Sequence, residues 1–375
     1  MTILRPYQNL AISLLRQAFK DGHTRLLYQG ATGSGKTVMF VELARRTAAQ
    51  GNRVCILVHR RELLRQASRS LKAAGVYHNL IARGEPHRDA LVTVASKDTL
   101  RRRDGHEFDL VIVDEAHHAV ANTYKSIMSA SAWVLGVTAT PCRLSGRGLS
   151  TVFDTLICGP SIKELTPQYL SPYSLYAPPC QVDLRGMRAL GGDYQKDALD
   201  QAMDTRQITG DAVEHYKRYL NGRPAIAFCC SVKHAYHVAE QFQAAGFRAD
   251  GVDGTLDQDT RDDRIAALGD GRLNVLTSCD LISEGLDIPV VAGAILLRPT
   301  KSLNIYLQQV GRVLRVAPGK TQAVILDHVG NVWRHGLPDM DREWSLTEGV
   351  VKPPKEAEVR EAVKQCPECF YAHTP

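Results

Sequence analysis

Aromatic residues, a cysteine framework and long hydrophobic runs are scarce or missing in this chain of 375 residues. Aromatic side chains make up 6% of it, so any contact with nucleic acid would rely on charge more than on base stacking. The nine cysteines are odd in number and scattered, which excludes the disulfide framework of a secreted protein. The longest apolar run, Val290–Leu297, is too short to cross a bilayer, and the N-terminal stretch lacks the features of a signal peptide. We therefore expect a cytoplasmic protein without a membrane partner.

Neither sign of charge dominates, since 46 lysines and arginines face 40 aspartates and glutamates, for a net charge of +6. Acidic residues outnumber basic ones after position 341, so the excess positive charge lies before it. A basic main part permits a polyanionic partner without requiring one. The apolar fraction of 44% and the charged fraction of 23% are typical of a folded globular protein. At about 150 residues per domain, the length suggests two domains.

Short apolar runs alternate with helix-like stretches in two separate parts of the chain. Continuous apolar strands joined by helical crossovers are typical of a parallel sheet covered on both faces, so the pattern predicts an α/β fold with two such units in tandem. We expect strands at 26–29, 53–58, 91–95, 110–113 and 134–138, and then at 225–229, 274–277, 292–297 and 322–326. Between them lies a stretch rich in proline and glycine. The predicted organisation is a first domain at 1–155, a connecting segment at 156–204, a second domain at 205–340 and a tail at 341–375.

Residues 30–37, Gly-Ala-Thr-Gly-Ser-Gly-Lys-Thr, fit the phosphate-loop pattern between a predicted strand and a predicted helix. The glycines let backbone N–H groups turn around a polyphosphate, and the helix directs its positive end at the same anion. We predict that Lys36 reaches the β- and γ-phosphates and that Thr37 binds Mg²⁺. The predicted nucleotide-binding residues of this loop are Gly30, Thr32, Gly33, Ser34, Gly35, Lys36 and Thr37.

Asp114 and Glu115 directly follow the predicted strand at 110–113. An acid at the end of a buried strand lies at the carboxyl edge of the sheet, beside the phosphate loop. Asp114 suits Mg²⁺ binding, and Glu115 suits a general base that orients and deprotonates the attacking water. Together with the loop, this pair predicts an ATP hydrolysis site that uses Mg²⁺.

Further motifs occur in a fixed order at 5–8, 58–63, 93–96, 138–140, 228–232, 276–289 and 308–315. With them the chain resembles the superfamily-two helicases of the Asp-Glu-Ala-His group over about residues 1–340. The resemblance implies two RecA-like domains with parallel sheets and an ATP site in the cleft between them.

The resemblance also implies a role for individual residues. Arg5 and Gln8 would recognise the adenine, Asp287 the ribose, and Gln308 the γ-phosphate or the water. The residues that would link hydrolysis to domain movement are His117, Thr138 and Thr140. Contacts with the nucleic-acid backbone would come from Arg60, Ser96, Ser231 and Thr277. A serine or threonine at a strand end also suits a helix cap, and that alternative stays open.

The second predicted domain has no phosphate loop of its own. A loop in one domain lacks a cation for the charge that grows on the transferring phosphoryl group, and an arginine from a facing domain can supply it, which contributes about 10³–10⁵ in rate. Arg312 and Arg315 are three residues apart on a predicted helix, so both can face the cleft. The family assigns them this role. Gln309 is a departure, because many relatives have another arginine there.

The tail contains Cys366-Pro-Glu-Cys369, a spacing that supplies half of a tetrahedral zinc site. Only His373 follows it, so we expect either a Zn²⁺ site that is completed elsewhere or a tail without metal. A compact motor with such a tail is similar to the RadD-like helicases of bacteria and phages, which implies DNA repair or recombination and single-strand-binding or repair proteins as partners. DNA is thus the favoured substrate. The alternatives are an RNA helicase or remodeller, an ATP-gated binding or annealing module, and the motor of a restriction complex.

Overall fold

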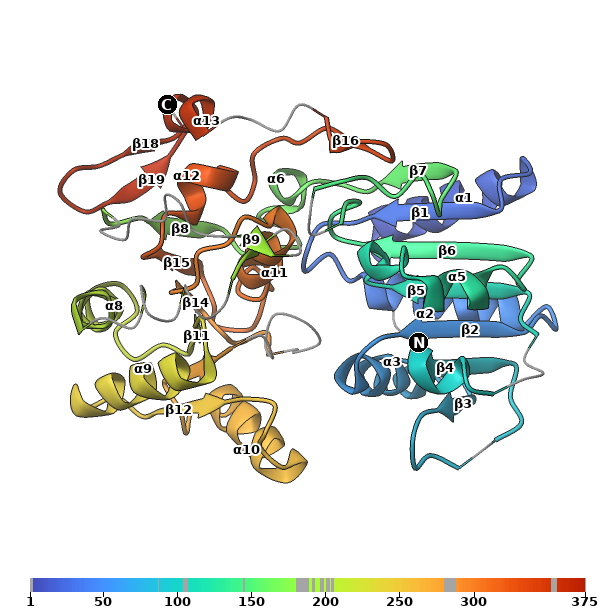
Figure 1. The fold of residues 1–375 in the computed structure, drawn as a ribbon, viewed down its shortest axis with the longest axis horizontal. Helices are drawn as coiled ribbons and strands as arrows, with labels where there is room; N and C mark the ends of the chain where they lie inside the picture. Colours follow the sequence, from blue (N-terminus) through green and yellow to red (C-terminus); the bar gives the residue numbers. More distant parts are fainter. Residues whose placement is uncertain are drawn as a thin grey trace. The chain divides into compact units, whose positions relative to one another are not determined.

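The computed structural model describes residues 3–86, 88–103, 107–143, 146–179, 189–190, 193–195, 199, 203, 206–279, 288–351 and 356–374. The chain divides into two compact units, drawn in Figure 1. The first unit comprises Met1–Ser161 and Arg342–Val351, and the second comprises Ile162–Asp341 and Lys352–Pro375. None of the described helices is long and apolar enough to span a bilayer.

The first unit is built on a seven-stranded sheet in the order β3-β4-β2-β5-β6-β1-β7. Every neighbouring pair in it is parallel. The central strands are largely apolar and buried because both faces of the sheet are covered. The strands are β1 (Arg25–Gln29), β2 (Val54–Val58), β3 (His78–Ile81), β4 (Val92–Ser96), β5 (Leu110–Asp114), β6 (Trp133–Thr138) and β7 (Thr155–Cys158).

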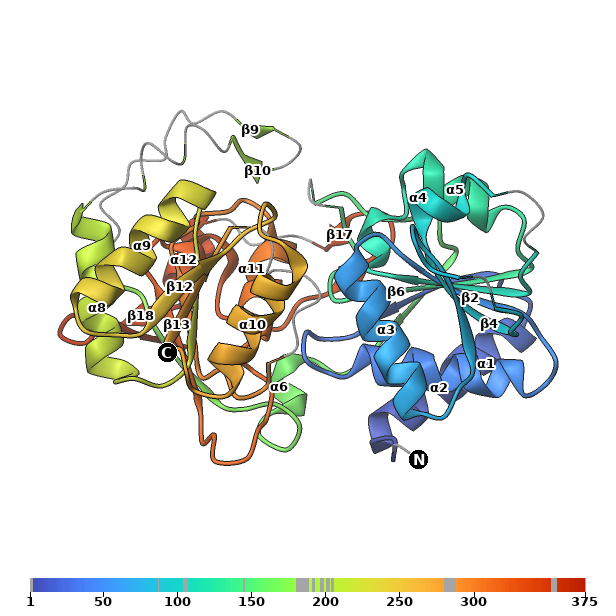
Figure 2. The ribbon, with the colours of Figure 1, turned by 90° about the horizontal axis from the view of Figure 1, so that it is seen from below.

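Helices cover both faces of this sheet, as Figure 2 shows. One face carries α1 (Pro6–Lys20), α2 (Lys36–Ala48) and α3 (Arg61–Ala73), whose apolar side chains form one core cluster with the sheet. The other face carries α4 (Lys97–Leu100) and α5 (Asn122–Met128), over a second cluster. A short 3₁₀ turn, η1 (Ala116–His118), follows β5. The sheet therefore presents its strand ends, and not its faces, to a ligand.

The second unit is built on an eight-stranded sheet in the order β12-β13-β11-β14-β15-β8-β19-β18. Its first six strands are parallel, β19 pairs antiparallel with β8, and β18 pairs antiparallel with β19. They are β8 (Tyr173–Tyr176), β11 (Ala225–Phe228), β12 (Ala249–Val252), β13 (Val275–Ser278), β14 (Gly293–Leu296), β15 (Ala323–Asp327), β18 (Lys364–Gln365) and β19 (Tyr371–His373). The prediction of two α/β units built on parallel sheets is confirmed.

Helices also cover both faces of the second sheet (Figure 2). One face carries α8 (Arg206–Tyr219) and α9 (Val232–Ala244), and the other carries α10 (Gln258–Gly269) and α11 (Leu303–Gly311). The remaining helices are α6 (Ile162–Leu165), α12 (Asn331–His335) and α13 (Glu356–Ala362). A two-stranded ribbon pairs β9 (Ala189–Leu190) with β10 (Asp193–Tyr194).

Residues 156–204 and 341–375 contain more regular structure than the sequence pattern predicts. In the first of these segments, β7 pairs with β1 and β8 pairs with β15, so each sheet gains a strand. In the second, β19 pairs with the outer edge of β8. This pairing satisfies backbone groups that an open edge would expose. These strands have three or four residues and no clear alternation, which explains why the sequence does not reveal them.

The tail also contributes to the first unit, through a hairpin of β16 (Trp344–Ser345) and β17 (Gly349–Val350). The backbone N–H of Ser150 donates to the carbonyl of Leu346 at 2.8 Å, and that of Gly148 donates to Thr347 at 3.2 Å. At Gly148 a Cβ atom would lie 2.0 Å from the Leu346 carbonyl oxygen, so only glycine permits this approach. The hairpin thereby closes one edge of the core around Leu149.

Candidate nucleotide site and second-unit motifs

Three predicted motifs meet at the carboxyl edge of the first sheet. The phosphate loop follows β1, Asp114 ends β5, and Thr138 ends β6, which lies between these two strands. In the strand register Gln29 is opposite Thr138, and Asp114 is opposite Val137. The backbone N–H of Gly30 donates to the Thr138 carbonyl at 2.9 Å. Ligands of parallel α/β sheets bind at such carboxyl edges.

The phosphate loop has a backbone that requires glycine at two positions. Gly33 and Gly35 have φ angles of +81° and +79°, in the left-handed region that other residues rarely adopt. A Cβ atom on Gly35 would also lie 2.7 Å from the Gln8 side-chain nitrogen. Helix α2 then begins at Lys36, whose ammonium donates to the carbonyls of Gly30 at 3.0 Å and Ala31 at 3.3 Å. The ammonium thus lies within the loop that it is predicted to serve.

The start of α1 is bound directly to this loop. Gln8 donates from Nε2 to the carbonyls of Ser34 at 3.2 Å and Gly35 at 3.3 Å, and its Oε1 accepts from the Arg5 backbone N–H at 2.9 Å. Tyr7 donates to the Ser34 carbonyl at 2.6 Å and accepts from the Arg5 guanidinium at 3.0 Å. Tyr7 was not among the predicted site residues, although it lies inside the motif that contains Arg5 and Gln8. The element predicted to recognise adenine therefore also supports the loop predicted to bind phosphate.

The acidic pair occupies a sharp turn at the end of β5. Asp114 is buried, and one of its carboxylate oxygens accepts from the backbone N–H of Glu115 at 3.0 Å. Glu115 has a φ of +50°, an uncommon conformation for a residue with a side chain and one that costs energy. Its carboxylate lies 3.4 Å from Nδ1 of His117. The strained turn thus holds two carboxylates at the sheet edge.

The three residues predicted to couple hydrolysis to movement are buried together. Nδ1 of His117 lies 3.3 Å from the Thr138 hydroxyl, which donates to the Thr140 carbonyl at 2.9 Å. The Thr140 backbone N–H in turn donates to that same hydroxyl at 3.2 Å. Gln29 adds a bond from its side-chain amide to the Ala139 carbonyl at 3.0 Å, a contact that no sequence motif predicts. A continuous polar path therefore leads from Glu115 through His117 to Thr138.

Two further histidine rings extend this cluster. The His118 ring lies 4.1 Å from the His117 ring and 4.4 Å from the His59 ring, between centroids. His59 follows β2, which neighbours β5 in the sheet. Arg60 immediately precedes α3, and Ser96 ends β4, so both predicted nucleic-acid contacts lie at the same carboxyl edge.

In the second unit, two predicted nucleic-acid contacts have structural roles. Ser231 caps α9, because its hydroxyl accepts from the His234 backbone N–H at 3.0 Å. Thr277 is fully buried, and its hydroxyl donates to the Ala235 carbonyl at 2.7 Å. Contact with a bound strand would require the Thr277 hydroxyl to give up this bond, and its role in nucleic-acid binding stays a prediction. Asp287 lies outside the described residues.

The predicted helix that carries both arginines is shorter than expected. Helix α11 contains Gln308 and ends at Gly311, with Arg312 as its C-cap residue. Arg315 lies beyond it, in an antiparallel bridge with Leu170. The prediction that Arg312 and Arg315 share one helix face is therefore wrong. The backbone at Arg315 is held by tertiary contacts instead of helical hydrogen bonds.

Cys366 and Cys369 lie in a tight turn before β19. The backbone N–H of Phe370 donates to the Cys366 carbonyl at 2.9 Å, and the Cys366 N–H donates to the Tyr371 carbonyl at 2.9 Å. Hydrogen bonds, first from the backbone of Cys369 and then from that of Glu368, lower the pKa of the Cys366 thiol. Over the described part of the chain, no group of three or more histidine, cysteine or acidic residues is placed to hold a metal ion. The two cysteines therefore form at most half of a zinc site here.

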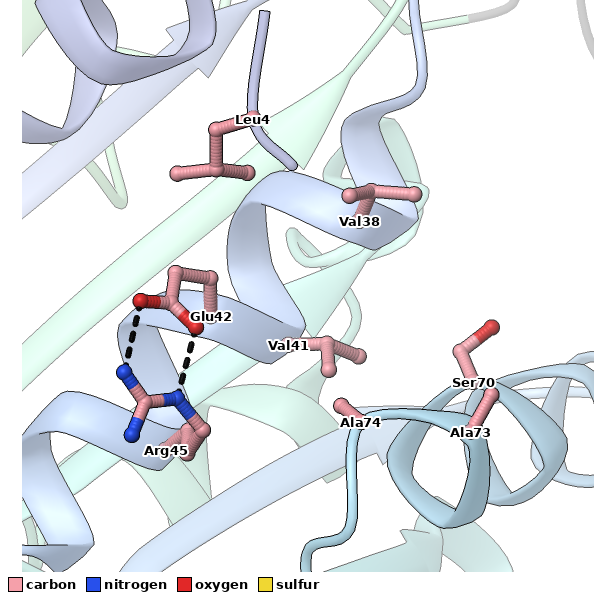
Figure 3. A pocket seen from close by; sticks show the side chains of 8 residues that line it. All are labelled: Leu4, Val38, Val41, Glu42, Arg45, Ser70, Ala73 and Ala74. Atoms are coloured by element: carbon pink, nitrogen blue, oxygen red, sulfur yellow. Dashed lines mark hydrogen bonds and ion pairs between the residues drawn. The ribbon is translucent and has the colours of Figure 1, made fainter. Parts of the chain in front are cut away.

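A small pocket of about 180 Å³ lies between Leu4, α3 and α2, the helix that follows the phosphate loop. Figure 3 shows its lining, in which Glu42 and Arg45 are joined by two hydrogen bonds of 2.7 and 2.9 Å. Hydrogen bonds from Arg45 and Arg46 lower the pKa of Glu42 to about 2, against the effect of burial. The rest of the lining is mostly apolar.

The loop, the acidic turn and the two sheets define a phosphate-loop ATPase with two RecA-like units. Residues 2–143 match the family described as "Type III restriction enzyme, res subunit", and residues 211–317 match "Helicase conserved C-terminal domain". The chain belongs to the superfamily-two helicases, and it is a nucleic-acid-stimulated ATPase.

Curated relatives agree with this assignment, and a solved structure shares the fold. A "51.5 kDa protein" of a Lactococcus phage is 38% identical over 92% of this chain and 74% of its own length. IRC3 of Saccharomyces cerevisiae, assigned as an ATP-dependent helicase, is 32% identical over 88% of this chain, which spans 52% of that protein. A fragment assigned as the HsdR subunit of a type I restriction enzyme from Vibrio vulnificus has the same fold, with a TM-score of 0.69 and 20% identity over 94% of this chain and 70% of its own.

Proposed function

We propose that this protein is an ATP-dependent helicase or translocase that acts on DNA. The observation that carries the proposal is the convergence of the phosphate loop, the Asp114–Glu115 turn and the path from His117 to Thr138 at one sheet edge. Such an edge can bind a nucleotide, hydrolyse it and respond to the change in its phosphates. A motor needs all three abilities.

The first unit supplies the groups that act on ATP. The glycine-lined loop and Lys36 bind the β- and γ-phosphates, while Arg5 and Gln8 recognise the adenine. Thr37 and Asp114 offer the hard oxygen ligands that Mg²⁺ prefers, and bound Mg²⁺ neutralises phosphate charge.

Glu115 orients the water and accepts its proton. His117 lies 3.4 Å from that carboxylate, so a change there reaches Thr138 and Thr140.

The second unit supplies positive charge at the moment of transfer. Arg312 and Arg315 stabilise the charge that grows on the transferring phosphoryl group, and Gln308 contacts the γ-phosphate or the water. We assign the motor domains to about residues 1–155 and 205–340, although short strands outside these ranges complete the sheets. Loss of the γ-phosphate then changes the grip on a strand, which converts hydrolysis into movement.

Backbone contacts with the strand come from Arg60 and Ser96 of the first unit, which lie at the ends of β2 and β4. The Ser231 hydroxyl is already used as a helix cap, so its contribution is smaller. DNA is favoured by two similarities. The fold matches a restriction-modification enzyme bound to DNA with a TM-score of 0.61, and a Sulfurisphaera tokodaii relative at 24% identity is named a DNA 3'-5' translocase.

The test is steady-state ATP hydrolysis without nucleic acid and then with single-stranded DNA, duplex DNA, forked DNA and RNA at matched salt. Strong stimulation by DNA and weak stimulation by RNA is the expected result. Stimulation by RNA alone would replace DNA with RNA as the substrate. Dbp5 of S. cerevisiae, whose structure was solved bound to RNA, has a similar fold with a TM-score of 0.60. Stimulation without strand separation on forked DNA would favour an annealing or clamping module.

A second candidate function is the motor of a restriction complex. The specific support is the match of residues 2–143 to a restriction-enzyme family, together with the fold similarity to the HsdR fragment. In that case a nuclease would copurify with the chain, and hydrolysis would depend on duplex DNA. Isolation of the chain with no nuclease, from cells that contain its natural neighbours, would contradict this function.

The cellular setting that we favour is DNA repair or recombination in the cytoplasm of a bacterium or on a phage genome, with a single-strand-binding or repair protein as partner. The support is the motif order, the Cys366–Cys369 turn and a phage relative. A zinc ion would require two further ligands in addition to these cysteines. Zinc analysis of the purified protein by mass spectrometry would test that part separately.

A further inference from the structure

Lys320 gathers backbone carbonyls from two separate segments of the second unit. Its ammonium donates to Val291 at 2.7 Å, to Val313 at 2.5 Å and to Arg315 at 2.8 Å, with a longer contact of 3.4 Å to Pro289. A turn over residues 317–320, in which Gly319 has a φ of +76°, brings this lysine back toward the segment that it follows. The three short bonds match the three donors of an ammonium group.

The clamped segment lies beyond the regular helix, with the side chains of Val313 and Leu314 buried in the core. Helix α11 ends at Gly311, and its last turn continues only as far as Val313, whose N–H donates to the Val310 carbonyl at 3.1 Å. On the far side of the segment, Ser171 donates from its backbone to the Leu314 carbonyl at 2.7 Å, and from its hydroxyl to the Arg315 carbonyl at 3.1 Å. The carbonyl of Arg315 therefore accepts from Ser171 and from Lys320 together.

These contacts differ in how much they can hold. Ser171 contributes two neutral donors on one side of the segment. Lys320 contributes charge-assisted bonds, which are roughly twice as strong as neutral ones, and it joins the segment to Val291 just before β14. Without the ammonium, three carbonyls lose a donor at once. The backbone would then be held less firmly at the residue that carries the predicted arginine finger.

We propose that Lys320 is a positioning residue for ATP hydrolysis, which fixes the backbone that presents Arg315 to the transferring phosphoryl group. The inference rests on the proposed function, in which Arg315 stabilises the charge of that group. Lys320 does not itself touch the nucleotide. A finger misplaced by about 1 Å loses up to about 10²-fold in rate, because the stabilisation depends on geometry.

The first experiment compares Lys320→Met, which keeps the length of the side chain but removes its donors, with the wild-type protein. The matched control is Lys217→Met, at an exposed lysine on α8 of the same unit. We expect kcat of Lys320→Met to fall about 10- to 100-fold, while its KM for ATP and its affinity for a fluorescent ATP analogue stay within about twofold. An unchanged kcat in a folded Lys320→Met protein would overturn the proposal.

A double-mutant cycle separates positioning from general stabilisation. If Lys320 acts through Arg315, then Lys320→Met has no further effect on kcat in an Arg315→Ala background. If the two losses multiply, Lys320 acts elsewhere and the proposal fails. Ser171→Ala tests the same carbonyl more gently, and a fall of about two- to fivefold in kcat is expected. This variant decides the question if Lys320→Met does not fold.

The pH dependence of the wild-type protein gives an independent readout. Burial, followed by repulsion from Arg315 and Arg223, lowers the pKa of Lys320 to about 8. Above that pH the amine keeps only two N–H donors, so kcat of the wild type should fall between pH 8 and 9. The pH profile of Lys320→Met should lack this fall.

A wild-type protein without nucleic-acid-stimulated hydrolysis would overturn the proposed function itself. A stimulated wild type whose kcat is insensitive to Lys320 and Ser171 would overturn only this inference.

Discussion

The predicted catalytic groups of the two units are held in different ways. In the first unit, Asp114 ends β5 and Thr138 ends the adjacent parallel strand β6. Lys36 begins α2, which follows β1, the next strand in the sheet. In the second unit, Arg315 lies beyond the end of α11 and depends on Lys320 and Ser171. A strand end is fixed by the whole sheet, whereas a turn is fixed by a few side chains. Damage at a distance should therefore reach the second unit's groups more easily than the first unit's.

The largest expected effect tests the rigid side of this comparison. Lys36→Ala removes the cation that the loop holds through the carbonyls of Gly30 and Ala31. Hydrolysis should fall by at least about 10³-fold, because the phosphates lose a charge that is stronger in the transition state. The measurement is steady-state turnover, with Lys72→Ala on the exposed side of α3 as the control. Near-normal turnover would show that the loop is not the phosphate site.

The next effect concerns the group that is held by a turn. Arg315→Ala should bind ATP normally but hydrolyse it about 10³-fold more slowly, since a finger acts mainly in the transition state. Nucleotide affinity by fluorescence and kcat by phosphate release separate the two steps. Arg272→Ala, at an exposed arginine of the same unit, is the control. A parallel loss of affinity and turnover would contradict the finger role and assign Arg315 to ground-state binding.

A smaller effect is expected at the buried polar path that leads from Glu115 through His117 to Thr138. Thr138→Val keeps the shape of the side chain but leaves the Thr140 N–H and His117 without the hydroxyl. Stability should fall by ~1–3 kcal/mol, the cost of an unpaired buried donor. The stimulation of hydrolysis by nucleic acid should fall several-fold, while the unstimulated rate changes less. Urea unfolding gives the first quantity, and equal losses in both rates would argue against a coupling role.

Sequence patterns predicted where the motifs of the first unit lie in the fold, because each motif adjoins a clearly apolar strand. The loop at Lys36 and the acids after 110–113 are examples, and the structure places both at one edge. The patterns failed where tertiary contacts set the geometry. Arg315 was predicted on a helix that ends before it, and Tyr7 was left out although it lies beside Gln8 in the same motif. Thr277 was predicted to contact nucleic acid, but its side chain is buried. No local signal distinguishes a hydroxyl that faces the core from one that faces a ligand, since strand ends host both.

The smallest expected effect returns to the rigid unit, where losing two partly exposed ion pairs on α2 should do little. Glu42 on α2 pairs with Arg45 and Arg46, each at 2.7 Å, and both arginines are partly exposed. Glu42→Gln should cost ~0.5–1 kcal/mol of unfolding free energy near neutral pH. Because the folded pKa of Glu42 is lowered from 4.5 to about 2, the stability that this carboxylate contributes is complete above about pH 4.5 and is lost as the pH falls toward 2. The two proteins should therefore unfold alike near pH 2 and differ near pH 7. ATP turnover should not change, because the pair lies on the flank of α2 and not in the loop; a loss of turnover would mean that this flank takes part in the site.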